Sequence, residues 1–305
     1  MVKLRDAYYC NLKLFLIFLV VFGHLIEPQI GADPVLYRLY RDIYLFHMPL
    51  FAFLSGLFLK DAAGCLRQLK RIFPLYLLCQ AVAVVLGHAP WHTPWWVLWY
   101  LLSLSGWLAV SAVFLRRGCG KWLVLAAAVA AGCLAGQVGW IGRPFSLSRS
   151  IVFFPYFWLG ICLEPGIRWE RFRVPSLLAL LLRPDVGAVT LYQAGACEPM
   201  VRLECYGFAL ALGLLVLSWC PRRRFPWTRA GADTMPAYLL HGPVVAALRP
   251  VPCPALAACL FLYITHKALR WFGAYGIIGR EEGPWPDSKS CTTPTESRST
   301  GSCCP

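Results

Sequence analysis

Residues 5–28 read RDAYYCNLKLFLIFLVVFGHLIEP, and this stretch decides the fold class of the chain. Nearly every side chain after Leu12 is apolar, as expected of a helix that satisfies its own backbone while it crosses a bilayer. Such a helix needs roughly 20 apolar residues to cross about 30 Å of hydrocarbon. The stretch has no small-x-small cleavage site and it carries Lys13 and His24, so we interpret it as a retained span and not as a signal peptide.

Apolar runs of this kind recur along the whole chain. Hydrophobic residues make up 58% of the 305 residues and charged residues only 14%, whereas about a quarter of the residues in soluble domains are charged. We therefore predict an all-α protein, a polytopic transmembrane bundle of about ten helices. It forms one membrane domain over residues 1–279, and a Ser-, Thr- and Pro-rich tail over 280–305 is expected to be disordered and cytoplasmic.

The predicted spans follow from the apolar runs between clusters of charge. The seventh is interrupted by Arg183-Pro184-Asp185, so it is open whether it is two half-helices, a re-entrant segment or a span whose break lines a cavity. The predicted spans are 12–27, 43–59, 72–88, 95–115, 121–137, 150–163, 174–193, 204–219, 235–250 and 254–272.

Charge is spread along the chain and does not gather in one patch. The net charge is +14, from 29 Lys and Arg against 15 Asp and Glu, and the basic residues fall in short clusters between the apolar runs. This distribution is typical of cytoplasmic loops, predicts that both termini are cytoplasmic, and argues against nucleic acid as a partner. The 14 cysteines show no metal-ligand spacing, so we interpret most of them as small apolar fillers and predict no metal site.

Lys13 and His24 lie eleven residues apart in the first run. Eleven helical steps of 100° end about 20° beyond three full turns and rise by about 16 Å. Both side chains are therefore expected on one face, along which a phosphate-bearing donor with a long flexible arm could reach from the cytosol to His24. An ionisable residue inside a span is costly and usually marks a site. The alternatives are that Lys13 extends to the interface and that His24 hydrogen-bonds a neighbouring helix.

Three further residues are candidates for the same chemistry. His47, in the second run, is expected at a similar depth to His24, where one imidazole could remove a hydroxyl proton and the other could orient it or stabilise charge. His241, about two turns into the ninth run from the cytosol, is expected at a different depth, where it would contact the donor path; it would meet His24 only if the helices tilt strongly. Arg149, at the outer start of the sixth run, suits an anionic or polyhydroxyl acceptor or simple interfacial anchoring.

Six stretches, taken together and in this order, resemble the acyltransferase-3 family of membrane enzymes that O-acetylate sugars and polysaccharides, most closely its fucose-acetylase-like branch. The resemblance extends to about residue 272. The stretches are RDAYYCNLK with Lys13 and His24 in a basic-x10-His pattern, FHMPLFAFLSGLF, RQLKRIFPLY, WWVLWYLLSL, SLSRSIVFFPYFWLG and YLLHG.

The resemblance implies an acyl-CoA donor, acetyl-CoA as co-substrate with no bound cofactor, and an outward-facing hydroxyl of a carbohydrate, glycolipid or cell-envelope glycan as acceptor. It implies that His24 is essential and that Lys13 contacts the donor. Arg67, Lys70 and Arg71 match an arginine-rich turn and would suit the CoA phosphates. A bacterial inner membrane is the setting that the resemblance implies.

The sequence thus predicts an integral membrane O-acyltransferase in which His24 and His47 are catalytic, Lys13, Arg67, Lys70, Arg71 and His241 bind the donor, and Arg149 binds the acceptor. One alternative is a multi-span transporter or flippase whose intramembrane histidines relay protons. The absence of a detectable inverted repeat weighs against it. A membrane scaffold or sensor without catalysis is the other alternative.

Overall fold

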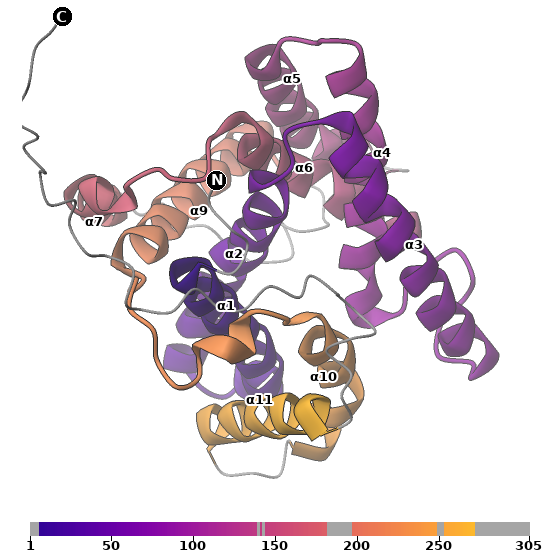
Figure 1. The fold of residues 1–305 in the computed structure, drawn as a ribbon, viewed down its shortest axis with the longest axis vertical. Helices are drawn as coiled ribbons and strands as arrows, with labels where there is room; N and C mark the ends of the chain where they lie inside the picture. The colour runs from indigo at the N-terminus through magenta and orange to yellow at the C-terminus, as the bar shows by residue number, and fades with distance from the viewer. Residues whose placement is uncertain (1–5, 139–140, 142–143, 182–196, 249–252, 272–305) are drawn as a thin grey trace, which may run out of the picture. The chain divides into compact units, whose positions relative to one another are not determined.

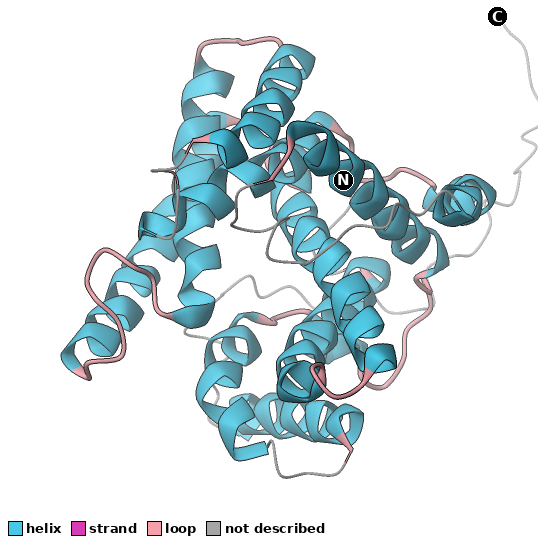
Figure 2. Ribbon diagram, turned by 180° about the vertical axis from the view of Figure 1, so that it is seen from behind, coloured by secondary structure: helices cyan, strands magenta, loops and turns pink. Residues whose placement is uncertain are grey.

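The computed structural model describes residues 6–138, 141, 144–181, 197–248 and 253–271. All secondary structure in these ranges is helical, as Figure 2 shows, which confirms the predicted all-α class. The predicted tail and the Arg183-Pro184-Asp185 break lie outside the described residues. The compact unit that ends at Lys267 holds the candidate site and is the part considered below.

Each described α-helix overlaps one predicted run, and Figure 1 shows their arrangement. They are α1 Ala7–Ile26, α2 Pro34–Leu57, α3 Ala62–Val85, α4 Trp99–Arg116, α5 Lys121–Leu134, α6 Leu147–Cys162, α7 Arg173–Leu181, α9 Pro199–Trp219, α10 Met235–Leu248 and α11 Pro254–Trp271. Short 3₁₀ turns join some of them, among them η1 Glu27–Gln29, η2 Trp96–Leu98, η5 Trp169–Phe172 and η6 Thr228–Gly231.

Of the helices that begin earlier than predicted, α1, α2 and α3 are each capped by an aspartate. Asp6 accepts a hydrogen bond from the Tyr8 amide at 2.9 Å at the start of α1. Asp33 and Asp61 do the same for α2 and α3, where they accept from backbone amides in the first turn. These caps satisfy amides that have no partner within the helix. The apolar runs mark only the part of each helix suited to lipid, so they miss the polar first turns.

Five described helical stretches are long and apolar enough to cross a membrane. They are Ala7–Gln29, Ala62–Val85, Trp96–Arg116, Pro144–Cys162 and Pro199–Trp219. The helix α2 is 24 residues long, but its first half carries Arg38, Arg41 and Asp42, and α5 and α10 have only 14 residues each. The structure therefore supports a membrane protein, while a total of about ten crossings stays a prediction.

The helical bundle has two ends, which we define by the direction of α1. The inner end is where α1 begins. There Tyr9 packs edge-on against Phe58 at the end of α2, with ring centroids 5.0 Å apart. Lys60, just beyond α2, donates to the carbonyl oxygens of Gly160 and Ile161 at 3.3 and 3.2 Å, so its charge lies at the C-terminus of α6, where a cation is favoured. The outer end is where α1 stops.

The helices α2 and α6 approach each other most closely at two glycines. A Cβ atom on Gly160 would lie far inside van der Waals contact of the Phe53 carbonyl oxygen, and one on Gly56 would overlap the Phe157 carbonyl oxygen. Small residues at such a crossing allow backbones to touch, which is how helices associate in membranes without a hydrophobic driving force. This contact joins the helix that carries His47 to the helix that carries Arg149.

We expect Gly160→Ala to lower the free energy of unfolding by about 1–3 kcal/mol, because the added methyl group must push α2 and α6 apart. Thermal unfolding of the detergent-solubilised protein measures this. The matched control is Gly207→Ala in α9, where a Cβ atom would meet no heavy atom within 4 Å. That substitution should leave stability unchanged or raise it by up to about 1 kcal/mol. Equal stabilities of the two variants would contradict the close packing.

Candidate active site

Four aromatic side chains from four elements meet at the outer end of α1. The His24 ring lies 4.9 Å from the Trp96 ring of η2 and 6.0 Å from the Tyr44 ring of α2, measured between centroids. It stacks on the His241 ring of α10, with centroids 5.4 Å apart and an interplanar angle of 23°. We call His24, Tyr44, Trp96 and His241 the histidine cluster. It brings together residues that are more than 200 positions apart in the chain.

The Nδ1 atom of His24 has two polar neighbours. It lies 3.2 Å from Oε2 of Glu27 and 3.1 Å from the Tyr44 hydroxyl. The Tyr40 hydroxyl donates to the other oxygen of Glu27 at 3.4 Å. Because a carboxylate only accepts hydrogen bonds, the Glu27 contact favours the tautomer with the proton on Nδ1. In that tautomer Nε2 of His24 has a lone pair that can take a proton.

His47 lies one turn beyond Tyr44 on α2. Its Nδ1 is 2.6 Å from the Ile43 carbonyl oxygen and therefore carries a proton that it donates. Its ring centroid is 4.9 Å from that of Tyr44, which also contacts His24. His24 and His47 therefore lie near each other, as predicted, but they do not touch directly. The Tyr44 ring contacts both imidazoles.

The predicted separation in depth between His241 and His24 is wrong, since the two rings stack. The prediction placed residue 235 at the cytosolic surface. Instead, the segment before α10 runs along the inner half of α1, where Lys13 donates to the Ala232 carbonyl oxygen at 3.1 Å. The six helical steps from Met235 to His241 rise by about 9 Å, the non-helical residues 232–234 extend the chain further, and the eleven steps from Lys13 to His24 rise by about 16 Å. The two histidines therefore reach nearly the same level.

Trp96 reaches the cluster through an unusual backbone conformation. Its φ of +36° lies in the left-handed region, which is uncommon for a residue other than glycine. Trp96 is 37% exposed, and its ring also lies 6.1 Å from that of His241. A Cβ atom on Gly242 would come within 3.2 Å of the same ring, so the glycine after His241 makes room for it. Strain of this kind is concentrated at functional sites.

Lys13 and His24 contact one continuous stretch of the chain, which confirms their predicted shared face. Lys13 contacts Ala232, and His24 contacts His241 on the helix that follows. The helices α1 and α10 lie side by side in Figure 1, as their contacts require. The seam between α1 and the 221–248 stretch therefore runs from Lys13 at the inner half to His24 at the outer half.

Asn11 anchors the 221–234 segment to α1. Its Nδ2 donates to the carbonyl oxygens of Pro221 and Arg223, each at 2.9 Å, and its Oδ1 accepts from the Thr228 hydroxyl at 2.6 Å. A Cβ atom on Gly231 would overlap the Cys10 carbonyl oxygen, so backbone touches backbone here. These contacts fix the start of α10 and hence the position of His241.

The remaining predicted site residues lie in two places. Arg67, Lys70 and Arg71 are exposed on the first turns of α3, at the inner end and away from the histidine cluster. Arg149 is half-buried at the outer end, with its guanidinium carbon 5.1 Å above the Trp99 ring. It is close enough to interact electrostatically with Tyr40, Tyr44 and Tyr238. The structure thus brings Arg149 toward the cluster and leaves the α3 cations apart from it.

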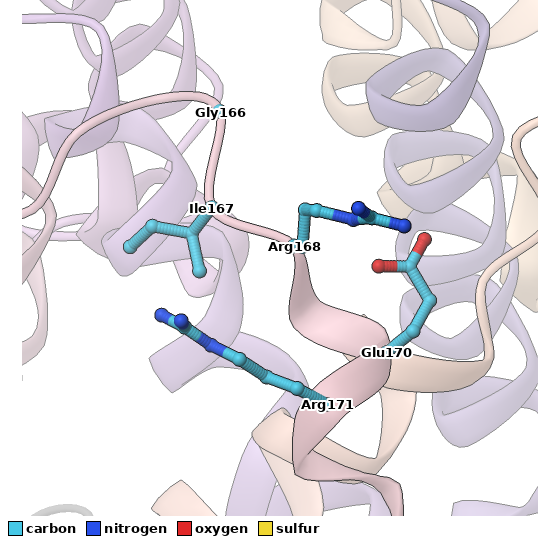
Figure 3. A pocket seen from close by; sticks show the side chains of 5 residues that line it. All are labelled: Gly166, Ile167, Arg168, Glu170 and Arg171. Atoms are coloured by element: carbon cyan, nitrogen blue, oxygen red, sulfur yellow. The ribbon is translucent and has the colours of Figure 1, made fainter.

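A surface hollow lies at the inner end and not at the histidine cluster. Figure 3 shows it between Gly166, Ile167, Arg168, Glu170 and Arg171, with the Arg171 side chain extending toward Ile167. Arg222 of the 221–234 segment forms a two-pronged ion pair with Glu170, and this hydrogen bonding lowers the pKa of Glu170 to about 2. With Glu170 paired in this way, the two lining arginines give the hollow a positive character.

Comparison with known families supplies the chemical class. A model described as an acyltransferase domain, that of the acyltransferase-3 family, matches residues 6–265. The chain belongs to the acyltransferase-3 family. The match covers the histidine cluster, the α3 cations, Arg149 and the hollow. Neither the curated proteins nor the solved structures gave a match.

Membership of the acyltransferase-3 family, with helices able to span a bilayer, makes the chain a membrane acyltransferase and favours the predicted enzyme over a transporter or scaffold. The fucose-acetylase-like branch stays a prediction. Sequence reasoning missed Glu27 and Tyr44. Glu27 could have been found, because positions 24 and 27 share one face at helical spacing. Tyr44 and Trp96 carried no signal beyond their aromatic character.

Asn11→Ala should destabilise the protein by about 1–3 kcal/mol, because it leaves the Pro221 and Arg223 carbonyls and the Thr228 hydroxyl without their partner. We expect faster cleavage by trypsin in the segment that contains Arg222, Arg223 and Arg224. Thermal unfolding and limited proteolysis with mass spectrometry measure both effects. Gln137→Ala, at a polar side chain on a different segment, is the control, and equal cleavage rates in the two variants would contradict the anchoring role.

Proposed function

We propose that this acyltransferase-3 protein transfers an acyl group, acetyl in the simplest case, from cytosolic acyl-CoA to a hydroxyl of a carbohydrate or cell-envelope glycan on the outer side of the membrane. The observation that carries the proposal is the seam from Lys13 to His24, which leads from a half-buried cation in the inner half of α1 to a partly buried imidazole at the outer end. In this arrangement both termini are cytoplasmic, the chain crosses the bilayer about ten times, and the membrane is a bacterial inner membrane.

His24 is the general base of the proposed reaction. The Glu27 contact keeps the proton on Nδ1, so Nε2 takes the proton of the acceptor hydroxyl as its oxygen attacks the thioester carbonyl carbon. A carbon–oxygen bond forms, the carbon–sulfur bond breaks, and the leaving CoA thiolate takes the proton back from the imidazolium. Glu27 stabilises that imidazolium while it exists, as an orienting carboxylate does in other acyl-transfer sites.

His47 supports this chemistry through Tyr44. The Tyr44 ring lies between the two imidazoles, and its hydroxyl is within hydrogen-bond distance of His24 Nδ1. His47 and its bond to the Ile43 carbonyl therefore fix the position of the phenol that packs on the base. In this proposal His47 is a positioning residue.

The donor enters from the inner end. Its phosphates bind the exposed cations Arg67, Lys70 and Arg71, and its flexible arm passes Lys13 along the seam to the histidine cluster. Charge-assisted hydrogen bonds from several cations suit a group with several phosphates. The hollow at Arg168 and Arg171 is a second place for those phosphates, supported by its positive character. His241, at the far end of the seam, meets the reactive end of the donor.

The acceptor approaches from the outer end, where Arg149 stacks on Trp99. An aromatic ring beside a guanidinium suits a sugar, because the ring packs on its apolar face while the cation donates to hydroxyl or carboxylate oxygens. Arg149 therefore binds the acceptor in the proposal and orients its hydroxyl toward His24.

His24→Ala should lower the rate of acyl transfer by about 10²–10⁴-fold, the usual contribution of a general base. The measurement uses the purified full-length protein, acetyl-CoA labelled in the acetyl group and a panel of glycans. The matched control is His88→Ala, which removes an exposed histidine that stacks on Trp95 outside the cluster. If the His24 variant transfers the acetyl group as fast as the control, His24 is not the general base.

Replacing Arg67, Lys70 and Arg71 with Gln should raise KM for acyl-CoA by about two- to fivefold for each charge removed, as expected for exposed ion pairs, and should leave kcat near the wild-type value. The increase should shrink at high salt. Arg116→Gln/Arg117→Gln removes two exposed cations at the end of α4 and is the control. If KM rises only in Arg168→Gln/Arg171→Gln, the donor phosphates bind in the hollow and not at the cations of α3.

A further inference from the structure

His241 is fully buried and only half satisfied. Its exposed fraction is 0%. Its Nδ1 is within hydrogen-bond distance of the Tyr238 carbonyl oxygen, one turn back on α10. Its Nε2 is buried and has no hydrogen-bond partner among the described residues. Leaving a buried polar atom unpaired costs free energy, so such an atom in a folded protein calls for an explanation.

The Tyr238 contact determines what Nε2 can do. A carbonyl oxygen only accepts, so the proton of the neutral imidazole is on Nδ1. Nε2 then carries a lone pair and accepts hydrogen bonds, but it donates none. In this state it cannot stabilise an oxyanion, which requires a donor. The unsatisfied atom therefore needs a partner with an N–H or O–H group.

The position of His241 selects the partner. The His241 ring stacks on that of His24, the proposed general base. The group that donates to Nε2 of His241 therefore belongs to one of the two reactants that meet at His24. His241 also ends the seam that begins at the Lys13–Ala232 contact, along which the proposed donor reaches His24. The acceptor hydroxyl has one proton, which His24 takes in the proposed reaction. The donor arm, by contrast, brings an amide N–H close to its thioester.

We propose that His241 Nε2 accepts a hydrogen bond from the amide N–H nearest the thioester in the pantetheine arm of acyl-CoA. The inference rests on the proposed function, because it takes the donor path along the seam from there. His241 is then a donor-binding residue that places the thioester carbonyl beside His24. Its bond to Tyr238 serves to present Nε2 in the accepting form.

The test separates the two nitrogens of His241 by substitution. In His241→Asn, the side-chain amide can still donate to the Tyr238 carbonyl, but nothing replaces Nε2. In His241→Gln, an oxygen can reach the place of Nε2 and accept there. His88→Asn is the control. Binding is measured directly, by calorimetry on the detergent-solubilised full chain. The ligands are S-acetylpantetheine and its analogue with an ester oxygen in place of the nearest N–H.

Wild type should bind the amide thioester about tenfold more tightly than the ester analogue. His241→Asn should lose this preference and bind both as weakly as wild type binds the analogue. His241→Gln should keep part of it, and the control should behave like wild type. Thermal unfolding of each variant shows whether it is folded.

Equal binding of the two ligands by wild type, or a full preference in His241→Asn, would overturn the inference. So would the absence of binding to either ligand. The proposed function fails separately: a protein that prefers the amide ligand but transfers no labelled acetyl group to any hydroxyl has the inferred donor site without the proposed reaction.

Discussion

The contact between the 221–234 segment and the inner half of α1 is the constraint on which the candidate site depends. Gly231 lies so close to the Cys10 carbonyl that no side chain fits between them, and Asn11 satisfies two backbone carbonyls and one hydroxyl of the same segment. The segment therefore cannot shift along α1 without losing these three hydrogen bonds. Because α10 starts directly after it, this register decides that His241 meets His24 and no other part of α1.

Each of the three imidazoles in and beside the cluster has an accepting oxygen at its Nδ1. Glu27 holds the Nδ1 proton of His24, and carbonyl oxygens hold those of His47 and His241. In a membrane interior no water is present to hydrogen-bond an unpaired polar group, so the loss of any of these contacts costs free energy. Three imidazoles that all keep their protons on Nδ1 suit a site that receives protons and hydrogen-bond donors from its ligands.

The helices could be predicted from the sequence because lipid imposes a simple rule on composition, and apolar runs report it directly. The shared face of Lys13 and His24 could be predicted because it depends only on helical periodicity within one element. The meeting of His24 with His241 could not, since it depends on how deeply the 221–234 segment runs along α1. That depth is set by a glycine contact and by Asn11, and neither leaves a periodic signal.

The two ends of the bundle differ in the way that the proposed transfer across a membrane requires. At the inner end Arg67, Lys70 and Arg71 are exposed, so in the proposed function they bind the donor phosphates at little desolvation cost. At the outer end His47 and His241 are buried, and a hydrogen bond to a buried group has a larger effect because the local dielectric is low. Lys13 lies between the two regions, half-buried and held by the Ala232 carbonyl. In the proposed path the phosphates of the donor stay at the exposed cations, and only its neutral arm continues past Lys13 to His24.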